Sequence, residues 1–108
     1  MSDLKIEIAN KQVEKCLRGL PQYAGMQFMV ELDSVSKGNP HSLEIEHLTS
    51  VGRGVIELKI NGNPGPGYRC VYTTKIPGKI VILHAFKKTK NGPDVHNCNV
   101  AKQRLKSL

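Results

Sequence analysis

The spacing of apolar residues changes once along this chain, and that change limits the folds open to it. Up to about residue 35, apolar residues recur every three or four positions, which is the period of an amphipathic helix. From Val55 the period is two, as in a β-strand with one covered face. The chain has 108 residues, which suits one domain spanning 1–108. We therefore expect an α+β fold with helices packed on a sheet.

The helical half divides into two segments. A first helix is predicted over about 6–20 by the apolar residues Ile6, Ala9, Val13, Cys16, Leu17 and Leu20. A second is predicted over 21–35, with Pro21 in its first turn, where the missing N–H has no helical partner. Together they would form an N-terminal helical hairpin. Residues 41–53 are either irregular or contain one short strand or helical turn.

The second half predicts an antiparallel meander followed by a helix. Strands are expected over 55–60, 68–74 and 80–86, and the segments between them are rich in Gly and Pro. The strand over 80–86 is apolar on both faces, which is typical of a central strand covered on both sides. Asp94 is suited to cap a last helix that starts at Val95. The sheet would then have three or four strands.

Charge is distributed unevenly between the two halves. Residues 1–50 hold 5 Lys and Arg against 7 Asp and Glu, whereas residues 51–108 hold 11 against 2. A basic half in a small protein indicates a polyanionic partner, and nucleic acid is the commonest one. No apolar run is long enough to cross a membrane and no secretory signal is evident, so we expect a cytoplasmic protein without a membrane partner.

Two cations lie at defined places on the predicted strands. If strands 55–60 and 68–74 pair, Lys59 and Arg69 could approach each other on one face, and such cations repel unless an anion lies between them. The alternative is that Arg69 forms a surface ion pair with Glu57, which stabilises little. The lysines at 87, 88 and 90 follow the apolar strand, either as an anchored basic run or as a solvated loop.

The histidines offer further candidates. His84 is expected on the face of Ile80 and Ile82, either as an interior hydrogen-bonded histidine or as a proton carrier. His96 falls in the first turn of the last helix, where a surface position is expected. No recognisable metal-ligand spacing is present, and we expect neither a metal nor another cofactor.

Three segments in order resemble the RelE/ParE toxin superfamily, and most of all its phage-related, HigB-like branch. They are residues 54–59 (GVIELK), 67–72 (GYRCVY) and 82–88 (ILHAFKK), followed by a C-terminal helix. The similarity covers about residues 50–108, and the N-terminal helices agree only in type. At the place where a family member has a further basic residue on the first sheet strand, this chain has Glu57 or Val55.

The resemblance implies a toxin of a type II toxin–antitoxin pair, an endoribonuclease that cuts messenger RNA in the ribosome without a metal ion. By position, Arg69, Lys88 and Lys59 would hold the phosphate, and His84 or His96 would act as acid or base. Lys87, Lys90 and Arg53 are expected to bind RNA. The implied partners are messenger RNA, the ribosome and a cognate antitoxin with a helix-turn-helix.

Two other functions remain open at this point. A ParE-like protein would inhibit DNA gyrase by binding and leave transcripts intact. A phage-related relative that has lost toxicity would only bind nucleic acid or a protein partner.

Overall fold

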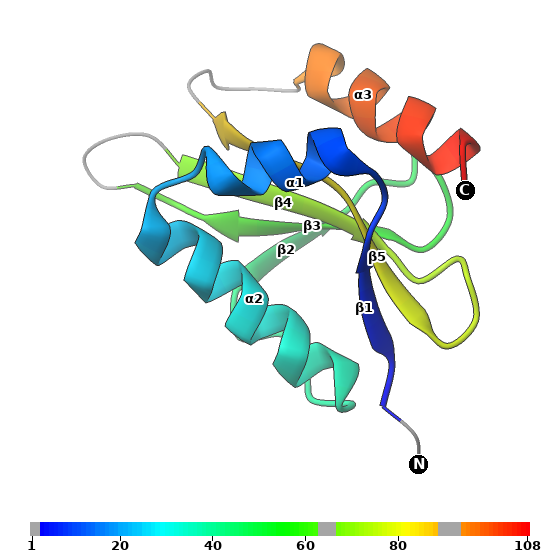
Figure 1. Cartoon of the computed structure of the whole chain (residues 1–108), viewed down its shortest axis with the longest axis horizontal. Helices are drawn as coiled ribbons and strands as arrows, with labels where there is room; N and C mark the ends of the chain where they lie inside the picture. Colours follow the sequence, from blue (N-terminus) through cyan, green and yellow to red (C-terminus); the bar gives the residue numbers. More distant parts are fainter. Residues whose placement is uncertain (1–2, 63–66, 89–93) are drawn as a thin grey trace.

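The structure is a computed structural model that describes residues 3–62, 67–88 and 94–108 (Figure 1). Within these ranges the elements are β1 (Lys5–Ile8), α1 (Lys11–Arg18), α2 (Gln22–Ser36), β2 (Glu44–His47), β3 (Val55–Ile60), β4 (Gly67–Thr73), β5 (Lys79–Lys88) and α3 (Val95–Lys106). The sheet has the strand order β1-β5-β4-β3-β2. The predicted α+β class is confirmed, with two N-terminal helices, the β3-β4-β5 meander and a C-terminal helix.

The first helix is shorter than the sequence predicted, because residues 5–8 form a strand. β1 pairs in parallel with β5, Lys5 lying opposite Lys79 and Ile8 opposite Ile82, so the sheet is mixed rather than antiparallel throughout. α1 starts only after Asn10, whose side chain accepts a hydrogen bond from the Val13 N–H at 3.1 Å. The apolar spacing at the N-terminus fits either period, and pairing with the available edge of β5 decides for the strand.

The undecided segment 41–53 contains β2, which pairs antiparallel with β3 at the other edge of the sheet. A buried carboxylate holds the chain that leads into it. Glu31 of α2 is 4% exposed and accepts hydrogen bonds from the backbone N–H groups of Ser42 and Leu43 and from the Ser42 hydroxyl. The start of β2 is thereby fixed to α2.

Apolar side chains form a core on each face of the sheet. α1 and α2 cover one face with a cluster that includes Val13, Ala24, Phe28, Leu32, Leu58, Cys70, Tyr72, Ile80 and Ile82. α3 covers the other face with a second cluster, which includes Val55, Val71, Val81, Leu83, Ala101 and Leu105. β5 contributes to both clusters, which confirms the prediction of an interior strand covered on both sides.

A β-bulge in β5 changes the direction of His84. Val71 of β4 pairs with His84 but Tyr72 pairs with Ile82, so Leu83 is an extra residue in β5. Leu83 packs in the α3 cluster, and His84 also faces α3. The expectation that His84 shares the face of Ile80 and Ile82 is therefore wrong, because simple alternation does not continue through a bulge.

Asp94 caps α3 as predicted, accepting a hydrogen bond from the Asn97 N–H at 3.1 Å. Among the described residues, no helix combines the length and the apolar character that a membrane span requires.

Candidate functional site

Three basic side chains predicted to bind phosphate come from three neighbouring strands. Lys59 of β3 lies directly opposite Arg69 of β4, and Lys88 of β5 lies opposite Gly67, two positions before Arg69. Because residues two apart on a strand share a face, all three belong to the face covered elsewhere by α3. We call Lys59, Arg69 and Lys88 the basic cluster.

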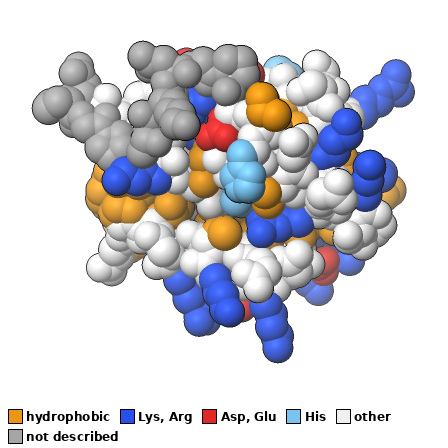
Figure 2. Space-filling view, turned by 90° about the horizontal axis from the view of Figure 1, so that it is seen from above, with side chains coloured by type: hydrophobic (Ala, Val, Ile, Leu, Met, Phe, Trp, Pro, Cys, Tyr) orange, Lys and Arg blue, Asp and Glu red, His pale blue; other side chains and the backbone are white. Residues whose placement is uncertain are grey.

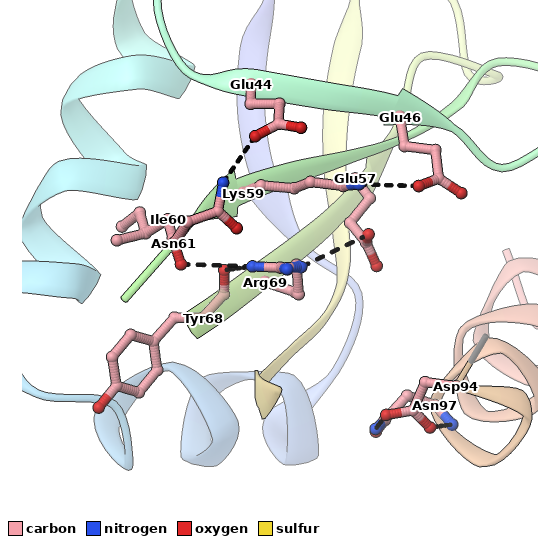
Figure 3. Close-up of polar contacts among 10 residues, drawn as sticks. All are labelled: Glu44, Glu46, Glu57, Lys59, Ile60, Asn61, Tyr68, Arg69, Asp94 and Asn97. Atoms are coloured by element: carbon pink, nitrogen blue, oxygen red, sulfur yellow. Dashed lines mark hydrogen bonds and ion pairs between the residues drawn. The ribbon is translucent and has the colours of Figure 1, made fainter. Parts of the chain in front are cut away.

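Arg69 is the most constrained member of the basic cluster. Its side chain is buried, and its Nη1 donates to the carbonyl oxygens of Tyr68 at 3.0 Å and Ile60 at 3.3 Å. Figure 3 shows these contacts with the Tyr68 and Ile60 carbonyl oxygens. A Cβ atom on Gly67 would come within 2.8 Å of both Arg69 Nη1 and the Ile60 carbonyl oxygen. A residue with a side chain at position 67 would exclude this conformation.

Two glutamates that were not among the predicted site residues lie close to these cations. Glu46 of β2 accepts a hydrogen bond from Lys59 Nζ at 2.8 Å, and Glu57 Oε1 lies 3.8 Å from Arg69 Nε (Figure 3). The ion pair between Arg69 and Glu57 considered as an alternative is therefore present, but it is buried rather than on the surface. Lys59 and Arg69 are also cross-strand partners, as expected if these strands pair. Glu57 and Lys59 are two positions apart in β3, and the period of two in the sequence places both on one face. This period was the sequence signal that could have identified Glu57 as a site residue.

The two carboxylates differ in their electrostatics. Burial raises the pKa of Glu57, with Arg69 opposing the rise. The hydrogen bond from Lys59 lowers the pKa of Glu46, which remains largely in solvent. Glu57 is thus the stronger base of the two, in a site where its charge is only partly compensated.

His84 is held by α3 through both ring nitrogens. Arg104 Nη1 lies 2.9 Å from Nδ1 and also donates to the Leu83 carbonyl, and since a guanidinium can only donate, Nδ1 accepts. Nε2 then carries the proton and donates to Asn97 Oδ1 at 2.6 Å, while the Asn97 amide donates to Asp94. Burial lowers the pKa of His84, and the nearby Arg104 charge lowers it further. His84 as a whole residue is 6% exposed.

The other predicted residues lie apart from the basic cluster. His96 is exposed in the first turn of α3, as expected. Lys87 is exposed on the opposite face, where it lines an open cavity with Tyr68 and the α1–α2 turn. Arg53 precedes β3, so it is at the far end of that strand from Lys59. Lys90 lies outside the described residues.

Basic side chains on the face seen in Figure 2 are scattered among other residues, at the edges and within the face, rather than gathered in one continuous patch. The excess of positive charge therefore does not by itself mark a binding surface there. The basic cluster is distinguished by its placement on rigid, paired strands.

A comparison with protein-family models gives a match over residues 15–106, to a model described as phage-derived protein Gp49-like (DUF891). The chain belongs to this Gp49-like family. The Gp49-like match includes β2 to β5, and with them the basic cluster, and leaves out β1. Neither curated proteins nor solved structures gave a match.

Proposed function

We propose that this Gp49-like protein is a toxin of the RelE/ParE type that cuts messenger RNA on the ribosome at the basic cluster. The observation that carries the proposal is the register: Lys59 and Arg69 are direct cross-strand partners, and Lys88 joins them from the next strand. Such rigid placement suits the binding of a phosphate. The phage-derived family and the resemblance of residues 54–88 to RelE/ParE toxins support the same function.

The chemistry requires no group beyond RNA and side chains. The 2′-oxygen of one nucleotide bonds to the adjacent phosphorus, and the bond from phosphorus to the 5′-oxygen breaks. The products are a 2′,3′-cyclic phosphate and a 5′-hydroxyl end. Negative charge accumulates on the phosphate oxygens in the transition state, where the basic cluster would stabilise it.

Two protons must move, one from the 2′-hydroxyl and one to the leaving 5′-oxygen. We assign the first to Glu57, because burial raises the pKa of its carboxylate and its Oε1 lies 3.8 Å from Arg69 Nε in the basic cluster. Both ring nitrogens of His84 are engaged with α3, so we assign it a positioning role. His96, the exposed one of the two predicted histidines, lies apart from the basic cluster in α3, so we assign no side chain to the second proton.

The partners belong to the same proposal. Ribosomal RNA would help to present the message to the sheet, and a cognate helix-turn-helix antitoxin would neutralise the protein. A neighbouring reading frame that suppresses toxicity when expressed together with this one would support the second expectation.

Induction of variants in cells tests the proposal. Arg69→Ala and Lys88→Ala are expected to abolish growth arrest and the new RNA 5′ ends that map to codons. Lys79→Ala is the matched control, because Lys79 is also a basic residue of β5 but pairs with Glu7 at the other end of the sheet.

The proposal fails if both cluster variants keep full toxicity while remaining folded by circular dichroism. Growth arrest with intact transcripts and altered plasmid supercoiling would instead indicate a gyrase inhibitor.

A further inference from the structure

Two cations of the basic cluster, Lys59 of β3 and Arg69 of β4, each lie close to a carboxylate of this chain. Lys59 Nζ lies 2.8 Å from Glu46, and Arg69 Nε lies 3.8 Å from Glu57. These carboxylates come from β2 and β3, where Glu46 is the cross-strand partner of Glu57, and each reaches its cation diagonally, two positions along the strand. The site therefore contains its own anions.

The two pairs differ in how firmly they are held. The Glu46 side chain is 56% exposed, whereas those of Glu57 and Arg69 are 12% and 10% exposed. At 3.8 Å, Arg69 Nε is too far from Glu57 for a hydrogen bond, and this buried N–H finds no acceptor among the described residues. Arg69 thus keeps an unused donor inside the site, and Glu46 is the carboxylate that can move away at little cost.

We propose that Glu46 is a built-in competitor of the RNA phosphate, occupying Lys59 in the free protein and leaving it when the message binds. The inference rests on the proposed function of the basic cluster. A carboxylate oxygen and a phosphate oxygen accept the same hydrogen bond from an ammonium group, so the two cannot hold Lys59 equally well at once. Glu46 would thereby reduce binding to any phosphate that engages Lys59 alone, and favour an RNA strand that also reaches Arg69 and Lys88.

The expected size follows from the exposure of Glu46, because its side chain is 56% exposed although that of Lys59 is only 18% exposed. Exposed ion pairs stabilise little, so removal of the Glu46 charge is expected to raise affinity about two- to fivefold. The effect should fall as salt rises, because solvent-exposed charges are screened.

The test measures binding of a 2′-O-methyl RNA oligonucleotide, which cannot be cleaved by its own 2′-oxygen, by fluorescence anisotropy at low salt. Glu46→Gln is compared with Glu7→Gln, which makes the same change in net charge. Glu7 pairs with Lys79 at 3.2 Å in another cross-strand contact, at the far end of the sheet. We expect Glu46→Gln to bind about two- to fivefold more tightly than Glu7→Gln.

A second comparison locates the effect. In a Lys59→Met background, Glu46→Gln should give no gain over Glu7→Gln, because the cation that Glu46 occupies is gone. Arg69→Ala tests whether the RNA oligonucleotide binds at the basic cluster at all, and it should bind more weakly than wild type.

Equal affinity of Glu46→Gln and Glu7→Gln, with weaker binding by Arg69→Ala, would overturn the inference and leave the proposed function standing. Unchanged binding by Arg69→Ala would overturn the proposed function, and the inference with it. A gain from Glu46→Gln that persists without Lys59 would also contradict the inference.

Discussion

Replacement of Glu31 by alanine should destabilise the fold strongly, although Glu31 lies outside the basic cluster. Its buried carboxylate accepts hydrogen bonds from Ser42 N at 2.8 Å, from Leu43 N at 2.9 Å and from the Ser42 hydroxyl. Each hydrogen bond to a charged group contributes about 1.5–3 kcal/mol. Because Ser42 is exposed and water can replace part of the loss, we expect the free energy of unfolding to fall by about 3 kcal/mol.

Thermal and urea unfolding followed by circular dichroism measure this change. For a chain of this size, about 3 kcal/mol corresponds to a fall in melting temperature of roughly 12–24 °C. Glu14→Ala is the matched control, since it removes an exposed helical carboxylate that pairs with Arg18, and it should cost less than about 1 kcal/mol.

The pH dependence adds an independent check. Burial alone would raise the pKa of Glu31, but the hydrogen bonds from Leu43 and Ser42 outweigh burial and lower it. A lowered folded-state pKa means that Glu31 contributes stability above its unfolded value of 4.5, and that this is lost as the pH falls through the folded value. The difference in unfolding free energy between wild type and Glu31→Ala should therefore narrow as the pH falls through the pKa of Glu31 in the folded protein. A variant within about 1 kcal/mol of wild type at pH 7 would refute the reasoning.

Three further outcomes are expected. Gly67→Ala should displace both the Arg69 guanidinium and the Ile60 carbonyl of β3, because its Cβ would lie 2.8 Å from each, and it should reduce RNA cleavage at least about tenfold, with a stability cost of about 1–3 kcal/mol. Gly25→Ala, whose new Cβ would meet its nearest atom at 3.7 Å, is the control, and equal activity of the two would contradict the assignment. His84→Gln should lose less stability than wild type between pH 7 and pH 5, as chemical denaturation at each pH would measure. The reason is that the lowered pKa of His84 makes the folded wild type less stable as the pH falls below 6.5. Glu57→Gln should remove the acidic limb of the pH–rate profile for RNA cleavage. This limb should lie above pH 4.5, because burial raises the pKa of Glu57. A variant whose profile keeps the limb would show that another group is the base.

Much of the sheet could be predicted from local pattern. The period of two over Val55–Ile60 and the Gly- and Pro-rich connections were enough to give β3, β4 and β5, and the same alternation brought Lys59 and Arg69 to one face. Those features depend on neighbours in the chain, and the side-chain period of a strand carries them directly.

The features that were missed depend on partners distant in sequence. Residues 5–8 fit either period, and β5 decides their structure from more than seventy positions away. The bulge at Leu83 turns His84 toward α3, and no alternation rule anticipates an extra residue. Glu46 could join the site only once residues 44–47 were known to pair with β3. Local sequence pattern thus predicts the cations of the site, whereas its carboxylate Glu46 and the direction of His84 depend on tertiary pairing.

The parallel pairing of β1 with β5 has a consequence for the order in which the chain is made. β1 is translated more than seventy residues before β5, so Lys5 has no strand to pair with until Lys79 has been translated and has left the exit tunnel. Closing so large a loop is slow, because its entropic cost precedes the gain from contacts. A nascent chain should therefore carry α1 and α2 without their sheet, and gain the assembled basic cluster only after β5 has been translated.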